Sequence, residues 1–277
     1  MSVGKLIRYG LPFSNVVATG TATNNVTAGR TLENFQLKLG GTTLTKAMLA
    51  LVKIKANGKV IMEGTGTEID KLNAYRGQTT SAAYLDLHFA DYSMLSEIDR
   101  MAGAFDTSLG VSNITSEVTT SGATAPTITP ILVESAQQKT TSGAMAPFAP
   151  LLTKFLRYPF AVATGGTLPM TVPFGPQSGA IIKRLHVFNT GGLMTGATVK
   201  QDGLVIHESL LAENTYMQLK HGRVAQTNVY TIDFCLDGNL AKALDTRDAK
   251  SLEWLFAFSG ADSGNVIVEY LDPLGNL

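Results

Sequence analysis

The sequence predicts an all-β chain that contains two antiparallel β-sandwiches in tandem, with short helices in loops. The 277 residues are rich in Gly, Thr, Ala and Val, a composition that favours short strands and turns. Each half contains about seven or eight candidate strands, at the spacing typical of a sandwich or jelly roll. No regular helices separate these strands, which argues against a parallel βαβ sheet. The third observation is that the two halves repeat one another.

The repeat begins with the opening strand of each half. Residues 5–20 read KLIRYGLPFSNVVATG, and residues 154–165 read KFLRYPFAVATG. With two short gaps, nine of the twelve positions in the second segment are identical to the first. The shared VATG ends at residues 20 and 165, which sets an offset of 145 that can be followed downstream.

The next repeated element is a β-hairpin. At the same offset, IKANGKVIME (54–63) aligns with VKQDGLVIHE (199–208). Asn-Gly and Asp-Gly are strong hairpin signals, because a type I′ turn needs positive φ at both central residues. The two-residue turns predict two apolar cross-strand pairs, Ile54 with Ile61 and Val199 with Ile206.

The later elements repeat in the same order. Gly77 aligns with Gly222, Leu87 with Ile232 and Phe89 with Phe234. Alternation in LDLHF (85–89) and YTIDF (230–234) predicts half-buried strands. The remaining segments are the helix-prone MLSEIDRMAGAFDT (94–107) and NLAKALDTRDAK (239–250), and the closing strand pairs VSNITSEV/APTITPILVE (111–118/125–134) and EWLFAF/GNVIVEYL (253–258/264–271). Four groups of matches on one offset indicate a duplicated β domain.

The predicted domains are residues 1–145 and 146–277, with a linker over about 136–153. The segment SAQQKTTSGAMAPFAP (135–150) is first polar and then rich in Ala and Pro, and it has no periodicity. Residues 14–29 are rich in Thr, Asn, Gly and Ala, so we expect an extended arm or a loosely held strand there.

The charge balance limits the class of partner. Lys plus Arg and Asp plus Glu both number 22, and charged residues make up only 16% of the chain. The chain therefore lacks the basic footprint of a direct, sequence-specific nucleic-acid binder. Low net charge protects poorly against self-association, a property expected of an assembly subunit.

Targeting and redox signals are few. The single cysteine, Cys235, excludes an intramolecular disulfide and a thiolate metal cluster. No apolar run approaches the ~20 residues of a membrane span. MSVGKLIRYG has no apolar secretory core, so we expect folding in a reducing cytoplasm.

Histidines offer little evidence of a catalytic or metal site. The four are His88, His186, His207 and His221, and none forms an H-x-H or H-E-x-x-H pattern. Asp86 and His88 share one face of a strand, where they could serve a metal or an acid–base role, or form part of a solvent-facing polar stripe. For His207 we expect an ordinary surface or interface role. We predict no catalytic and no cofactor-binding residue, and we assign no metal ligand.

Other candidate residues also favour structural roles. LGGTTLTKA (39–47) lacks the spacing of a phosphate-binding loop, and no G-x-S-x-G elbow is present. Cys235 lies in the apolar segment TIDFCL and is expected to be a buried structural thiol. Trp254 and Phe256 share one face of EWLFAF, which favours core packing over an interface. Acidic residues near loops that could bind calcium at a subunit contact are Asp237, Asp245, Asp248, Asp262 and Asp272.

Three segments resemble the major capsid protein of corticoviruses, the tailless icosahedral bacteriophages with an internal lipid membrane. They are NVYTIDFCLDGNL (228–240), VIVEYLDPL (266–274) and the hairpin VKIKANGKVI (52–61). The likeness is clearest over the last 50 residues and around the first hairpin. These motifs are structural rather than catalytic.

The resemblance implies a double jelly roll that forms homotrimers with a pseudo-hexagonal outline, located in the capsid shell of a virion and made in the cytoplasm of a bacterial host. It implies neighbouring capsomers, a penton or spike protein and internal viral membrane proteins as partners. Structural calcium is a cofactor by resemblance only, with no ligand assigned.

Two rival functions belong to other classes. A phage spike or other tandem β-sandwich binding module would place clustered aromatic residues in loops to stack on sugars. The chain has one tryptophan, predicted in a strand, which argues against that function. A jelly-roll enzyme of cupin type would need the histidine ligand set that the sequence lacks.

Overall fold

The computed structural model describes residues 4–108, 110–136 and 151–277. Within these ranges, no helix has the length and apolar character needed to cross a membrane. The chain divides into two compact units. The first comprises residues up to 74 with 78–156 and 273–277, and the second comprises 75–77 with 157–272. The predicted linker, about 136–153, falls mostly on residues outside the described ranges, and the predicted domains 1–145 and 146–277 stay a prediction.

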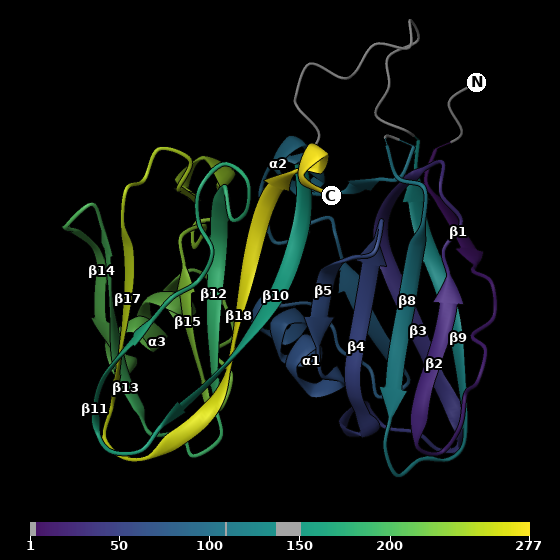
Figure 1. Ribbon diagram of the computed structural model, residues 1–277, viewed down its shortest axis with the longest axis horizontal. Helices are drawn as coiled ribbons and strands as arrows, with labels where there is room; N and C mark the ends of the chain where they lie inside the picture. Colours follow the sequence, from purple (N-terminus) through teal and green to yellow (C-terminus); the bar gives the residue numbers. More distant parts are fainter. Residues whose placement is uncertain (1–3, 109, 137–150) are drawn as a thin grey trace, which may run out of the picture. The chain divides into compact units, whose positions relative to one another are not determined.

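The first unit contains two antiparallel β-sheets (Figure 1). One has the strand order β1 (Leu6–Tyr9), β9 (Thr124–Ser135), β3 (Thr31–Thr43) and β6 (Tyr84–His88). The other has the order β5 (Lys59–Gly64), β4 (Leu49–Ala56), β8 (Ile114–Thr120) and β2 (Gly20–Asn25). Beyond β5, the first residues of β10 (Leu151–Val162) add a parallel strand, in which Phe155 pairs with Met62.

The second unit repeats this architecture. Its first sheet has the order β10, β18 (Asp262–Pro273), β12 (Ile181–Asn189) and β15 (Val229–Asp233). Its second sheet has the order β14 (Leu204–Leu210), β13 (Met194–Gln201), β17 (Leu252–Phe258) and β11 (Gly166–Met170). Each strand of the first unit therefore has a counterpart at the same place in the chain and in the sheets of the second unit, which confirms the predicted tandem jelly roll.

Minor elements correspond as well. The two-residue strands β7 (Phe105–Asp106) and β16 (Leu244–Asp245) pair with the matching strands β3 and β12. The predicted short helical stretches contain α2 (Glu97–Met101) and the 3₁₀ turn η2 (Leu240–Lys242). Further 3₁₀ turns are η1 (Lys46–Met48) and η3 (Leu274–Asn276).

The repeated hairpins have the predicted turns but not the predicted register. Asn57 and Asp202 both have positive φ, at 50° and 51°, and each is followed by a glycine at 81°. However, Ile54 pairs with Met62 rather than with Ile61, and Val199 pairs with His207 rather than with Ile206. A β-bulge inserts one extra residue at the same place in both hairpins. In the first unit it lets two successive residues, Ile61 and Met62, both be buried.

Two ten-residue helices were not predicted individually. They are α1 (Gly66–Tyr75), between β5 and β6, and α3 (Leu211–Lys220), between β14 and β15. A capping box precedes α1: the Glu68 carboxylate accepts from the Thr65 backbone N–H, and the Thr65 hydroxyl accepts from the Glu68 N–H. The T-x-x-E pattern in the sequence is the signal that could have predicted this helix start.

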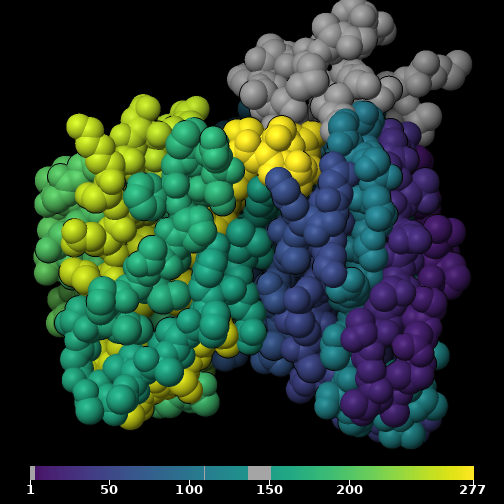
Figure 2. All heavy atoms as spheres, in the orientation of Figure 1, coloured from purple at the N-terminus to yellow at the C-terminus, as the bar shows by residue number. Residues whose placement is uncertain are grey.

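The strand β2 lies at an edge of its sheet, and its purple segment is on the surface of the first unit (Figures 1 and 2). It pairs only with β8 among the named strands. Its outward residues, including Thr21, Thr23 and Asn25, are exposed, whereas Ala22 is buried. The predicted loosely held strand within residues 14–29 is therefore an edge strand.

Candidate functional site: matching side-chain clusters in the two units

Asp86 and His88 lie on β6 as the alternation predicts, and both are half-buried. One oxygen of Asp86 accepts hydrogen bonds from Asn34 Nδ2 at 2.7 Å and Gln36 Nε2 at 2.8 Å, both on the neighbouring strand β3. The His88 ring packs edge-on against the Tyr92 ring at 5.6 Å. Asp86 therefore serves as a cross-strand hydrogen-bond acceptor. It is neither on a fully solvent-facing stripe nor in a group of three metal-binding side chains, of which the described residues contain none.

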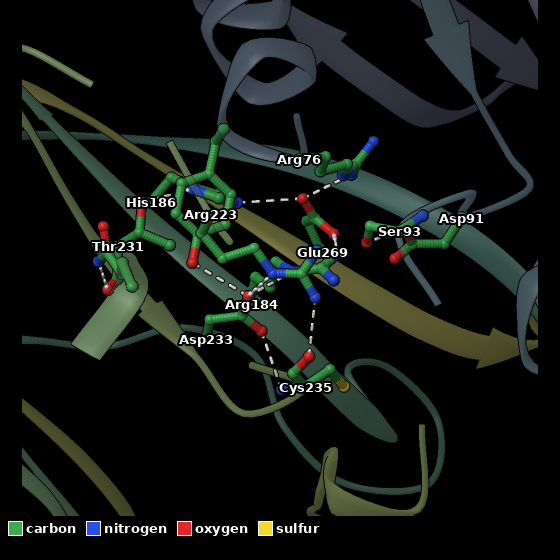
Figure 3. A network of polar contacts seen from close by, with 12 residues as sticks. Arg76, Asp91, Ser93, Arg184, His186, Arg223, Thr231, Asp233, Cys235 and Glu269 are labelled. Atoms are coloured by element: carbon green, nitrogen blue, oxygen red, sulfur yellow. Dashed lines mark hydrogen bonds and ion pairs between the residues drawn. The ribbon is translucent and has the colours of Figure 1, made fainter. Parts of the chain in front are cut away.

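The corresponding strands of the second unit contain a buried ionic cluster instead (Figure 3). Arg184 on β12 contacts two carboxylates: its Nε lies 3.0 Å from Asp233 Oδ2, and its Nη1 lies 3.0 Å from Glu269 Oε2. The side chains of Arg184 and Glu269 have no exposed area. The pairing is essential, because an isolated ion in such a site would lose its hydration without compensation.

Residues 75–77 and the segment after α3 complete the cluster. Arg76 Nη2 lies 2.6 Å from Glu269 Oε1, and the Tyr75 hydroxyl donates to Asp233 Oδ2 at 3.0 Å. Arg223 approaches Asp233 at 3.5 Å and donates to the backbone carbonyl of residue 235 at 3.1 Å. Burial raises the pKa of Tyr75, and the Asp233 carboxylate raises it further. Tyr75 is therefore a neutral donor.

His186 connects Glu269 to Thr231. Its Nε2 lies 3.0 Å from Glu269 Oε1, and its Nδ1 lies 2.9 Å from Thr231 Oγ1. Burial lowers the pKa of His186, against the opposing effect of Glu269. A neutral ring donates from Nε2 to the carboxylate and accepts at Nδ1 from the hydroxyl. For Glu269, burial alone would raise the pKa, but the Arg76 and Arg184 guanidinium groups hold it well below its ordinary value.

The clusters occupy equivalent backbone positions in the two units. Asn34 pairs with His88 across β3 and β6, as Arg184 pairs with Asp233 across β12 and β15. Gln36 and Asp86 correspond in the same way to His186 and Thr231. Polar clusters of different composition thus fill the same positions on the same fold, with the amides Asn34 and Gln36 in one unit and Arg184 and His186 in the other. Their burial and mutual pairing indicate that both clusters hold strands together.

A second shared contact attaches the helix to the sheet. The Asn73 side-chain amide on α1 donates to the Asp86 carbonyl at 2.8 Å, and the Gln218 amide on α3 donates to the Thr231 carbonyl at 2.9 Å. Asn214 donates to the Thr231 carbonyl as well, at 2.7 Å. These three helix side chains are buried, so each donor requires its acceptor.

Four of the five acidic residues considered for calcium have protein partners. Asp262 accepts from the backbone N–H groups of Gly191 and Leu193 at 2.8 and 3.0 Å. Burial would raise the pKa of Asp262, but these backbone donors lower it below its ordinary value. Asp272 accepts from the N–H groups of residues 179 and 180, and Asp245 pairs with Arg247. Asp237 accepts from a backbone N–H two residues on, and Asp248 lies in the loop after β16.

The other predicted residues have structural surroundings. His207, on the edge strand β14, is half-buried beside Tyr230, and burial lowers its pKa. Cys235 is fully buried, as predicted, but lies in a turn directly after β15 rather than within the strand. Trp254 and Phe256 have no exposed area in this chain, as core packing predicts.

The ionic cluster was missed by sequence reasoning. Its signal was the presence of charged residues inside otherwise apolar strands, in IIKRLHVFN (181–189) and VIVEYL (266–271). Such a residue is costly to bury unless an opposite charge meets it, so the two strands could have been predicted to be neighbours. They do pair, with Arg184 opposite Glu269.

The two jelly rolls have the same strand order, and their polar clusters hold neighbouring strands together. These features define a structural protein of the double jelly-roll class. Residues 8–139 match the family described as viral coat protein P2 N-terminal domain, and residues 152–274 match the viral coat protein P2 C-terminal domain. The chain therefore belongs to the viral coat protein P2 family. It is a viral structural protein of the capsid shell.

Solved structures of capsid proteins share the fold. The major capsid protein P2 of bacteriophage PM2 is 19% identical, with 97% of each chain covered and a TM-score of 0.84. The Sulfolobus Turreted Icosahedral Virus structure is 15% identical, covering 98% of this chain and 92% of that chain, with a TM-score of 0.72. The PBCV-1 capsid is 12% identical, with 98% and 94% covered and a TM-score of 0.63. A search of the curated proteins gave no significant match.

Proposed function

We propose that this coat protein forms homotrimeric, pseudo-hexagonal capsomers of an icosahedral bacteriophage shell. The observation that carries the proposal is that the two jelly rolls of one chain have the same strand order. Two similar blocks per chain give six blocks around a threefold axis. Contacts between unlike halves can then close a ring, since a heterologous interface closes when its rotation does.

The physical properties of the chain support an assembly role. The net charge is zero, so neighbouring subunits approach without long-range repulsion. The buried ionic cluster fixes strand positions by directional contacts, which suits a block that must keep its shape in a lattice. Neighbouring capsomers, a penton or spike protein and internal membrane proteins are the proposed partners.

Chemistry is not part of the proposed role. The coat-protein family is structural, and we propose that this chain has no catalytic activity. Structural calcium, implied by the corticovirus resemblance, is a further proposal. Metal analysis of purified particles, before and after treatment with a chelator, tests it independently of the fold.

The trimer is tested by native mass spectrometry and light scattering at micromolar concentration. We expect a species of three times the 29.4 kDa chain mass. Its interfaces should bury more than ~2,000 Å², as permanent assemblies do. The trimer should also unfold at a higher temperature as protein concentration rises, because association stabilises the folded state. A monodisperse monomer at every concentration would contradict the proposal.

A further inference from the structure

The second unit exposes an apolar surface on β14 and α3. β14 is the last strand of its sheet, with β13 as its neighbour on one side, and the described residues contain no partner strand on the other. Large exposed apolar side chains on these two elements are Leu204, Val205, Leu210, Leu211, Tyr216, Met217 and Leu219. An apolar sheet edge of this kind favours association with another chain, because its backbone groups can pair with another strand.

The equivalent surface of the first unit is covered. At the offset of 145, Leu72 on α1 corresponds to Met217 on α3; Leu72 is 3% exposed and Met217 is 42% exposed. The strand that corresponds to β14 is β5. Its outer edge is paired in parallel by β10, with Phe155 opposite Met62. The opening strand β10 therefore covers β5, whereas no described strand occupies the matching place beside β14.

The strand that matches β10 in the first unit is β1. The repeated opening aligns Phe155 with Leu6, and both strands lead into their jelly rolls in the same way. β1 pairs with β9 on one side and is the last strand of its sheet. Its residues Ile7 and Tyr9 are among the most exposed apolar side chains of the described chain. Within the described ranges, each chain thus has one opening strand and one receiving edge without a neighbouring strand on the outer side.

We propose that β1 of one copy adds in parallel to β14 of a second copy, with Leu6 opposite His207 as Phe155 is opposite Met62. In this register Tyr9 lies opposite Leu210, so two exposed apolar side chains are buried together. The interface is heterologous, and three copies close a ring in which every opening strand and every receiving edge is used. This inference rests on the proposed trimer and names the surface that forms it.

The direct test is a disulfide between two differently tagged, co-expressed chains, one carrying Leu6→Cys and the other His207→Cys. The native Cys235 is fully buried, so it should not compete. Under mild oxidation we expect a mixed dimer on a non-reducing gel and the linked peptides in mass spectrometry. Neither variant alone should cross-link. The matched control replaces Leu6→Cys by Leu95→Cys, an exposed apolar position elsewhere in the first unit, and should give no mixed dimer.

A second test uses charge. Leu210→Asp should weaken trimer formation at least tenfold while the circular dichroism spectrum of the chain is retained, and Ile98→Asp, an exposed apolar residue on α2, should leave the trimer intact. A monomeric wild-type protein would overturn the proposed function itself. If the wild-type protein is a trimer, but the Leu6→Cys and His207→Cys chains form no mixed disulfide and Leu210→Asp leaves the trimer intact, only this pairing of edges is overturned.

Discussion

Asn73 and Gln218 make the same hydrogen bond in the two units, each from a helix side chain to the backbone carbonyl of the strand residue 13 positions later. Their sequence numbers differ by 145, the offset at which the hairpins also repeat. Chemical identity is not kept, since one residue is Asn and the other is Gln. The amide donor is what both positions share.

The first prediction concerns these donors. Asn73→Ala should lower the free energy of unfolding by about 1–2 kcal/mol, because it removes a buried donor from its carbonyl. Gln218→Ala should cost less, since Asn214 still donates to the same Thr231 carbonyl. Denaturant titration of both variants measures the difference. Equal costs would show that the second donor is not a substitute.

Breaking the buried ionic cluster should be more damaging. Glu269→Gln leaves Arg76 and Arg184 without their shared carboxylate, and we expect a loss of about 3–5 kcal/mol. The matched control is Asp245→Asn, which breaks the exposed pair with Arg247 and should shift the midpoint little. Thermal and denaturant unfolding of the two variants should therefore differ clearly. Similar midpoints for both would refute the assigned role of Glu269.

The pH dependence of stability should contain a contribution from His186. Because burial lowers its pKa in the folded state, the unfolded chain binds more protons once the pH falls below about 6.5. Stability should therefore fall as the pH drops from 7 to 5. His186→Gln should reduce that slope, and Gln36 in the equivalent position shows that the fold can hold this side chain. An unchanged slope in melting temperature against pH would contradict the prediction.

The hairpin turn of the second unit offers a test by conservative exchange. Asp202 Oδ1 accepts from the N–H groups of Lys250 and Ser251, both at 2.8 Å, and Asn57 Oδ1 accepts from Ser112 in the matching turn. Asp202→Asn keeps the accepting oxygen and should be nearly neutral. Asp202→Ala loses it and places alanine at positive φ, which should cost about 1–2 kcal/mol. Calorimetry should rank the two variants in that order.

Local turn chemistry explains why much of the fold could be predicted. Asn57-Gly58 and Asp202-Gly203 restrict the backbone by themselves, so the two hairpins and their equivalence follow from four residues. The strand register did not follow from the turn residues. The bulge at Ile61 allows this side chain to be buried in the folded sandwich, and a rule based on the turn alone does not include the free energy of that burial.

The ionic cluster depends on contacts distant in sequence. Arg184 and Glu269 are 85 residues apart, and they become neighbours only when β12 pairs with β18. Each strand alone is compatible with an exposed charge. The helices α1 and α3 were missed because each is only ten residues long and its apolar pattern is correspondingly short; the capping pattern at Thr65 was the clearest local signal of α1.

The polar edge of β2 has a consequence for solubility. A chain without net charge gains no colloidal protection from electrostatic repulsion, and added salt has little repulsion to screen. Ser14 instead pairs antiparallel with Thr23 through both backbone groups, and the Asn15 side-chain amide donates to the Thr21 carbonyl, so residues 14 and 15 occupy part of a sheet edge that would otherwise recruit strands at random. This local cover does not depend on charge repulsion, so it would help to keep newly made subunits dispersed equally well in dilute and in saline solution.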